Sequence, residues 1–127
     1  MTAHFSLKEL TCTNTGIKNE PDSNSLKNLK VLAETVLEPL RATYNKPIYV
    51  TSGFRCKQVN AKVGGSKTSQ HLYGQAADLV CDNNEELFNI AKALIENGTI
   101  SVGQLINEKN FSWIHISTGT KNQIMSL

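Results

Sequence analysis

Two histidines and one aspartate occupy positions where their side chains could share a metal ion. His71 and Asp78 lie in the stretch SKTSQHLYGQAADLV, and His115 lies in SWIHIS, near the end of the chain. Two imidazoles and one carboxylate form the ligand set of an open catalytic zinc site, in which water completes the coordination. Zinc needs deprotonated donors, which neutral histidine and ionised aspartate supply at neutral pH. We therefore treat His71, Asp78 and His115 as candidate zinc ligands.

The stretch around His71 also has a simpler interpretation as a surface turn. A histidine and an aspartate seven positions apart are a weak signal, and a lone histidine is more often a hydrogen-bonded structural residue than a ligand. Gly74 allows the backbone to turn tightly between the two residues in either case. Ser69 would serve as a turn residue or as a hydrogen-bond partner of a ligand. The spacing alone leaves the turn and the metal site both open.

Arg55 and Trp113 are further candidates for the same site. Arg55 follows a Ser-Gly break in TSGFR, where an arginine is most often a surface charge. In a zinc cleft its guanidinium would instead hold a substrate carboxylate through two hydrogen bonds or stabilise an oxyanion. Trp113 stands two residues before His115, so the two side chains share one face of a strand, although tryptophan is usually a core residue. Ile114 and Ile116 occupy the other face, so the core holds them and His115 is aimed toward a cleft.

The elements that must position these residues follow from hydrophobic periodicity. Apolar residues at helical spacing predict a long helix over 19–44, an amphipathic helix over 83–98, and shorter helices within 4–16 and 56–63. Period-two patterns predict strands over 47–51, 74–81, 104–108 and 113–117. Residues 109–112 form a hairpin turn between the last two strands. The prediction is an α+β domain, with a small antiparallel sheet flanked by helices.

Size and composition limit the function classes. The chain has 127 residues, of which 39% are hydrophobic and 19% charged, so we expect a single domain over residues 1–127. A net charge of +2 with interspersed signs gives no clustered basic patch of the kind that binds nucleic acid. Cys12, Cys56 and Cys81 form no C-x-x-C pair, which predicts reduced, buried or half-buried thiols. We expect a monomer without nucleic-acid or membrane partners.

Several motifs in a fixed order resemble a known group of zinc peptidases. VTSGFR, VNAKVGGSKTSQHLYGQAADL, QLINE and WIHIS are similar to motifs of the zinc D-alanyl-D-alanine carboxypeptidases and their phage-lysin relatives. That group shares its fold with the D-Ala-D-Ala dipeptidases and the hedgehog signalling domain. HFSLKELT and VLEPLRATY also resemble a compact, bacterial and prophage-encoded branch, so the resemblance covers residues 4–118.

The resemblance implies a hedgehog/DD-peptidase-like fold and one zinc ion per chain, held by His71, Asp78 and His115. Arg55 matches the arginine that the family places near the carbonyl or carboxylate of the substrate. The implied activity is hydrolysis of peptide bonds by a zinc-activated water. The implied substrate is a peptidoglycan stem peptide or muropeptide, cut by a D-Ala-D-Ala carboxypeptidase or a related endopeptidase.

The general base departs from the pattern of the family. The dipeptidase relatives carry a glutamate three positions before the second histidine ligand, and here that position is Ser112, whose hydroxyl is too weak a base. The nearest carboxylate is Glu108 in QLINE, which matches an acidic residue common in this branch. A hairpin would place Glu108 across from the strand of His115, although a solvated charge beside a turn is the plainer interpretation. The alternative function is a zinc-binding module with little catalysis, used in cell-wall binding or phage assembly.

The N-terminal sequence bears on the location of such an enzyme. MTAHFSLKEL lacks the basic start and the apolar segment of a secretory signal. The protein is therefore expected to be cytoplasmic as synthesised. A wall enzyme would then need another route out, such as a phage-type release, and the alternative is a cytoplasmic muropeptide as its target.

Overall fold

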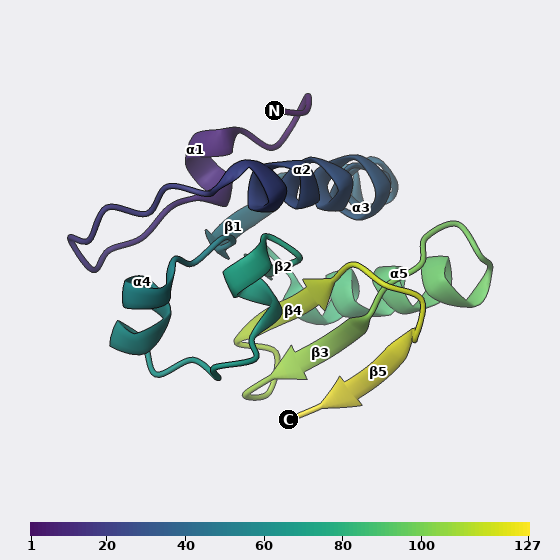
Figure 1. Ribbon diagram of the computed structural model, residues 1–127. Helices are drawn as coiled ribbons and strands as arrows, with labels where there is room; N and C mark the ends of the chain where they lie inside the picture. Colours follow the sequence, from purple (N-terminus) through teal and green to yellow (C-terminus); the bar gives the residue numbers. More distant parts are fainter.

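The computed structural model describes residues 1–127, in which helices dominate the first third of the chain and three consecutive strands end it (Figure 1). The elements are α1 (Leu7–Leu10), α2 (Ser23–Leu32), the π-helical turn η1 (Ala33–Leu37), α3 (Glu38–Tyr44), β1 (Tyr49–Ser52), α4 (Lys57–Lys62), the 3-10 helix η2 (Gln70–Tyr73), β2 (Ala76–Val80), α5 (Asn84–Glu96), β3 (Gln104–Glu108), β4 (Trp113–Ser117) and β5 (Gln123–Ser126). The predicted α+β class is confirmed. None of the helices combines the length and the apolar character needed to cross a membrane.

The five strands form one sheet in the order β1-β2-β4-β3-β5. The pairs β1–β2, β2–β4 and β3–β4 are antiparallel, as predicted, and β3 and β4 form the predicted hairpin. The sheet is nevertheless mixed, because the edge strand β5 runs parallel to β3. No strand is predicted after residue 117, so β5 is an addition to the predicted sheet. The segment QIMS is too short to show a period of two, and its backbone pairing with β3 is what defines it as a strand.

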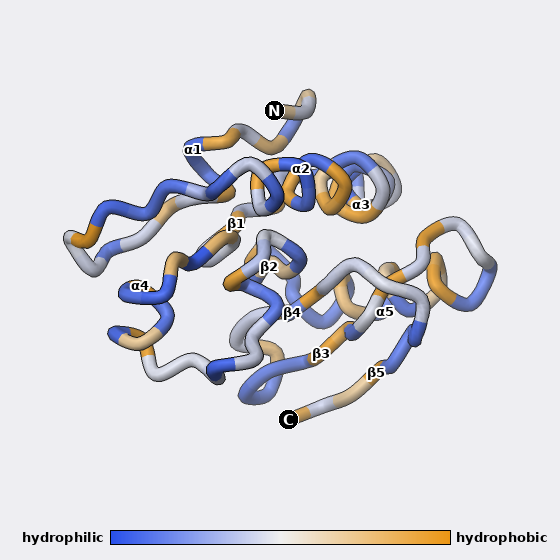
Figure 2. Tube along the Cα trace, viewed as in Figure 1, coloured by the Kyte–Doolittle hydropathy of each residue, from blue (hydrophilic) through white to orange (hydrophobic).

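The two faces of the sheet differ in character. One face is apolar and fully buried, and it carries Ala77, Leu79, Leu105, Ile114 and Ile116. Helix α5 lies behind β3 and β4 in Figure 1 and contacts this face. Hydrophobic and hydrophilic residues alternate along α2 and α3 in Figure 2, as expected of helices with one buried side. Since side chains alternate across a strand, Asp78 and His115 project from the opposite face.

The predicted long helix is confirmed, but the π-helical turn η1 interrupts its regular winding between α2 and α3. The N-terminus of α2 is capped by Asp22, whose carboxylate accepts the backbone N–H of Ser25 at 2.7 Å. Helix α2 packs beside η2, where the side chain of Asn28 donates to the carbonyl of Tyr73 at 2.9 Å. The first turns of α2 therefore support the short helix that carries His71.

The cysteines agree with their predicted state. Cys12, Cys56 and Cys81 are free thiols, and each is half-buried. Burial is the main cause that raises the pKa of the Cys12 thiol, with the nearby charge of Glu9 adding to it.

Candidate metal centre

His71 lies in the 3-10 helix η2 rather than in the loop expected before β2. The hydroxyl of Ser69 accepts the backbone N–H of His71 at 3.2 Å, so this serine caps η2 and contacts the backbone of the histidine, not its ring. Gly74 ends η2 with a φ of 71°. A Cβ at Gly74 would overlap the carbonyl oxygen of Ser25 on α2, so the close approach of the two helices requires glycine.

The tautomer of His71 follows from the hydrogen bond that its Nδ1 makes with a backbone carbonyl. Its side chain is buried, and Nδ1 lies 2.7 Å from the carbonyl oxygen of Gly53. A carbonyl can only accept, so Nδ1 carries the proton and Nε2 keeps a free lone pair. This lone pair points toward Asp78, with Nε2 at 3.3 Å from Oδ1. The arrangement is the one that metal-binding histidines adopt.

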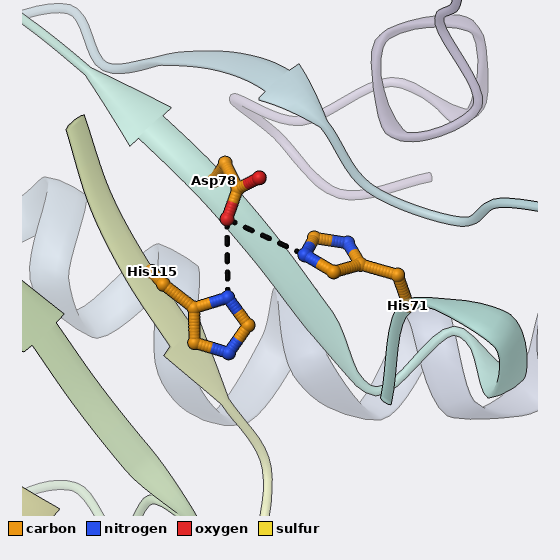
Figure 3. A group of neighbouring side chains, drawn as sticks. All are labelled: His71, Asp78 and His115. Carbon is orange, nitrogen blue, oxygen red and sulfur yellow. Dashed lines mark hydrogen bonds and ion pairs between the residues drawn. The ribbon is translucent and has the colours of Figure 1, made fainter. Parts of the chain in front are cut away.

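Asp78 and His115 come together through strand register. They stand directly opposite each other in the β2–β4 pair, although 37 positions separate them in the chain. Nδ1 of His115 lies 3.1 Å from Oδ1 of Asp78. Figure 3 shows this single carboxylate oxygen facing both imidazole rings. The donor atoms of His71, Asp78 and His115 all lie within 4.8 Å of one another.

The spacing of these donors fits a zinc ion. Tetrahedral zinc with bonds of about 2.0–2.1 Å keeps its ligand atoms roughly 3.3 Å apart. The two distances from Asp78 Oδ1 to the histidine nitrogens, 3.1 and 3.3 Å, match that spacing. Two nitrogens and one carboxylate oxygen leave a fourth coordination position open, as in catalytic sites.

The protonation state of Asp78 suits the same role. Burial of the carboxylate works to raise its pKa, but hydrogen bonds from His115 and His71, together with the charge of the imidazoles, hold the pKa of Asp78 well below its ordinary value. The group is therefore ionised at neutral pH, which metal coordination requires.

Arg55 lies against Asp78 on the side away from the imidazoles. Its Nη2 is 3.3 Å from Oδ2 of Asp78, while Nε donates to Ser52 Oγ at 2.9 Å and Nη1 donates to Asn60 Oδ1 at 3.4 Å. The side chain is only 16% exposed. All three nitrogens of the guanidinium thus have acceptors within the protein. The predicted contact of Arg55 with substrate stays a prediction. The sequence does not single out Asn60, because an asparagine in a short helix carries no signal of burial.

A cavity of about 650 Å³ lies beside His115, and Glu108 lines it as well. The register of β3 and β4 pairs Ile106 with His115 and Glu108 with Trp113, so these side chains share the face of the sheet that carries Asp78. The Glu108 carboxylate takes part in none of the ion pairs of the structure. The hairpin therefore brings an unpaired carboxylate and a candidate metal ligand to one cavity.

The wall of the cavity is almost entirely polar. Ile106 is its one hydrophobic residue, and hydroxyl, amide and charged side chains supply most of the remainder: Ser66, Thr68, Ser69, Gln70, Gln104, Thr118, Thr120, Lys121 and Gln123. Such a lining offers hydrogen bonds to a peptide or a sugar and little to an apolar ligand.

Ser112 and Trp113 have structural surroundings that the sequence does not reveal. The Ser112 hydroxyl donates to the carbonyl of Lys109 at 2.6 Å, which stabilises the turn between β3 and β4. Lys109, Asn110 and Phe111 in this turn all have positive φ. Trp113 is half-buried, and its indole nitrogen is buried without a hydrogen-bond partner.

Comparisons with known proteins bear on the family and on the cofactor. A family model described as Peptidase M15 matches residues 3–117. A zinc D-Ala-D-Ala carboxypeptidase from Streptomyces albus G is 54% identical over 35 residues, which cover 28% of this chain and 14% of that relative. The matched segment is thus a small part of the relative. The predictions of the family and of a zinc cofactor are confirmed. With its His-Asp-His group in place and the family model matching nearly its whole length, the chain belongs to the peptidase M15 family.

Proposed function

We propose that this M15 metallopeptidase hydrolyses peptide bonds in peptidoglycan stem peptides, as a D-Ala-D-Ala carboxypeptidase or a related endopeptidase. The observation that carries the proposal is the shared cavity of His115 and Glu108, because it places a metal site and a free carboxylate in one space. The likeness to the Streptomyces enzyme supports the choice of substrate.

The metal supplies one part of the chemistry. Zinc, when bound, acts as a Lewis acid and lowers the pKa of its water from 15.7 to about 7. Two of the ligands are held in the state that zinc binding requires. His71 is held in one tautomer by the Gly53 carbonyl, and Asp78 is kept ionised by its hydrogen bonds.

Glu108 supplies the proton transfers in this proposal. Its carboxylate takes a proton from the attacking water as the new carbon–oxygen bond forms at the scissile carbonyl. It then gives that proton to the departing amine as the carbon–nitrogen bond breaks. Trp113 lies opposite Glu108 in the register of β3 and β4. Ser112 has no part in these steps, since its hydroxyl is held in the turn.

The polar cavity would accommodate the stem peptide. A peptide presents one N–H and one carbonyl per residue, and the amides of Gln70, Gln104 and Gln123 can both donate and accept. A stem peptide carries small side chains and free carboxylates, so it has little apolar surface that a binding site must bury. The single hydrophobic lining residue, Ile106, is consistent with such a ligand.

Digestion of purified peptidoglycan tests the proposal. The zinc-loaded protein should release alanine or cut stem peptides, as seen by mass spectrometry of the products, and the His115→Ala protein should leave them intact. Unchanged stem peptides after incubation with fully zinc-loaded protein would exclude the peptidase.

The second candidate is a zinc-binding module of the same fold with little catalysis. The observation that favours it is Ser112, which stands where the dipeptidase relatives have their catalytic glutamate and serves the turn instead. Sedimentation with intact cell walls, combined with no cleavage at full zinc loading, would support this candidate over the enzyme.

A further inference from the structure

Asn60 is a buried polar residue that the proposed mechanism does not use. It lies on α4, the residue is only 4% exposed, and both ends of its carboxamide form hydrogen bonds. Oδ1 accepts from Nη1 of Arg55 at 3.4 Å, and Nδ2 donates to the carbonyl of Ser66 at 2.9 Å. The backbone carbonyl of Asn60 also accepts the N–H of Gly65 at 2.9 Å. Asn60 therefore joins Arg55 to the segment that begins the cavity wall.

Arg55 continues this path to the metal site. Its Nη2 is paired with Oδ2 of Asp78, the carboxylate oxygen that the imidazoles do not contact. Its backbone N–H donates to the carbonyl of His71 at 2.9 Å. One residue thus contacts two of the three candidate ligands, through its backbone and its guanidinium. A planar guanidinium that is held by acceptors on all sides can define the plane of the carboxylate beside it.

Gly65 provides the space for this arrangement. A Cβ at this position would overlap Oδ1 of Asn60 and lie 3.1 Å from Nη1 of Arg55. Only glycine lets the chain pass this close to the paired side chains. The backbone, the asparagine and the arginine are therefore packed as one unit against Asp78.

We propose that Asn60 is a positioning residue, which acts through Arg55 to hold Asp78 in its metal-binding orientation. The proposal rests on the metal site of the proposed function but not on its substrate. It differs from the substrate contact that the resemblance implies for Arg55, because all three guanidinium nitrogens face acceptors of the protein.

Zinc affinity is the first measurement, made by competition with a chromophoric chelator. Partners that orient metal ligands typically contribute about 10–100-fold in affinity, so Arg55→Lys should weaken zinc binding within that range and Asn60→Ala by roughly tenfold. Asn60→Asp keeps the acceptor for Arg55 and loses the donor to Ser66, so its affinity should stay near that of the wild type. Asn107→Ala is the matched control, since Asn107 is equally buried and bonds to Phe111 instead. Its zinc affinity should not change.

A double-mutant cycle then separates positioning from general damage to the fold. If Asn60 acts through Arg55, Asn60→Ala should cost little further zinc affinity in an Arg55→Lys background. Unchanged affinity in Asn60→Ala, additive losses in the double variant, or equal losses in Asn60→Asp and Asn60→Ala would each overturn the proposal. Asn60→Asp also covers the case in which Asn60→Ala does not fold.

Kinetics at saturating zinc distinguish the two roles for Arg55. A positioning role predicts that Arg55→Lys keeps a near-normal KM once the metal is loaded, whereas a raised KM at full loading would show a substrate contact and overturn this part of the proposal. If no peptidase activity is found for any form of the protein, the proposed function fails. The double-mutant cycle, which measures zinc affinity alone, still decides the role of Asn60.

Discussion

At the scale of single residues, the metal site depends on three donors that converge from separate places and on the partners behind them. His71 uses one ring nitrogen for the Gly53 carbonyl and the other for the site. Asp78 divides its two oxygens between the imidazoles and Arg55. No other His, Cys, Asp or Glu joins the group that could hold a metal. The site therefore has no spare donor.

Removal of any one donor should abolish tight zinc binding. His71→Ala, Asp78→Ala and His115→Ala each leave two ligands, which are too few to hold zinc in a protein site. Elemental analysis of the purified variants gives the zinc content per chain. Full occupancy in two of the three variants would show that the assigned ligand set is wrong.

Glu108→Gln should separate metal binding from catalysis. The substitution preserves size and removes the titrating group, so zinc content and the fold should be retained. General acid–base catalysis is typically worth about 10²–10⁴-fold, and kcat should fall within that range. The measurement is kcat on a D-Ala-D-Ala-terminated peptide at matched zinc content. A decrease of less than about threefold would remove Glu108 from the mechanism.

At the scale of elements, the short helix η2 is held by close contact with α2. Gly74 ends η2 with positive φ, and a Cβ at this position would overlap the carbonyl oxygen of Ser25. Gly98, after α5, has a similar φ of 80° but nothing within 4 Å of the position that a Cβ would take. A comparison of substitutions at Gly74 and Gly98 therefore separates two losses of stability: the loss from a left-handed backbone and the loss from a steric clash.

Gly74→Ala should be more harmful than Gly98→Ala. Both variants place alanine in the left-handed region, which costs roughly 1–2 kcal/mol, and only Gly74→Ala adds a collision that shifts η2 away from α2. Because η2 carries His71, Gly74→Ala should also weaken zinc binding, and Gly98→Ala should not. Urea unfolding and chelator competition measure the two effects. Equal stability losses with equal zinc affinities would show that the approach of η2 to α2 is not tight.

The N-terminal segment is joined to α3 by a pair of hydrogen bonds. The backbone N–H and Nδ1 of His4 both lie 2.7 Å from the carboxylate of Glu38. Burial alone works to raise the pKa of Glu38, but the hydrogen bonds from His4 prevail and lower the pKa below its ordinary value of 4.5. A lowered folded-state pKa means that the pair stabilises the protein above the unfolded-state pKa. That contribution is lost as the pH falls through the folded-state value.

His4→Ala should therefore lower the Tm at pH 7 by a small amount, since the His4 side chain is 47% exposed. The difference from the wild type should shrink as the pH falls through the lowered folded-state pKa of Glu38, because the carboxylate then becomes protonated in both proteins. Thermal unfolding followed by circular dichroism at several pH values checks this. A difference in Tm that stays constant into the acid range would mean that the Glu38 carboxylate has no part in it.

At the scale of the whole molecule, the metal site joins separate parts of one core. Its donors come from η2, β2 and β4, and the neighbouring Arg55 follows β1. The unfolded chain does not hold these groups together, so zinc binds the folded state by preference. Folding and metal binding are therefore coupled.

Zinc should accordingly raise the thermal stability of the protein. At a free zinc concentration 100 times the Kd, binding to the folded state contributes about 2.7 kcal/mol. The Tm of the wild type should rise with zinc and fall back with a chelator, and the Tm of Asp78→Ala should respond to neither. An unresponsive wild-type protein would argue against a preformed zinc site.

The sequence by itself determined the helices and four of the strands, because these features depend on local periodicity. The alternation in WIHIS is enough to place Ile114 and Ile116 in the core and His115 on the other face. The family and its zinc were expected from a resemblance carried by several motifs in a fixed order, of which the element from Ser69 to Asp78 and WIHIS are the most specific. Each of these motifs is a run of residues that are close together in the chain.

Only the tertiary structure decided how distant residues meet. The register of β2 with β4 sets Asp78 opposite His115, and the approach of α2 to η2 fixes His71 beside them. The partners of Arg55, the burial of Asn60 and the pairing of β5 with β3 depend likewise on contacts between separate segments. Local patterns carry no record of such contacts, because side-chain packing and backbone hydrogen bonds across the fold select among many compatible arrangements.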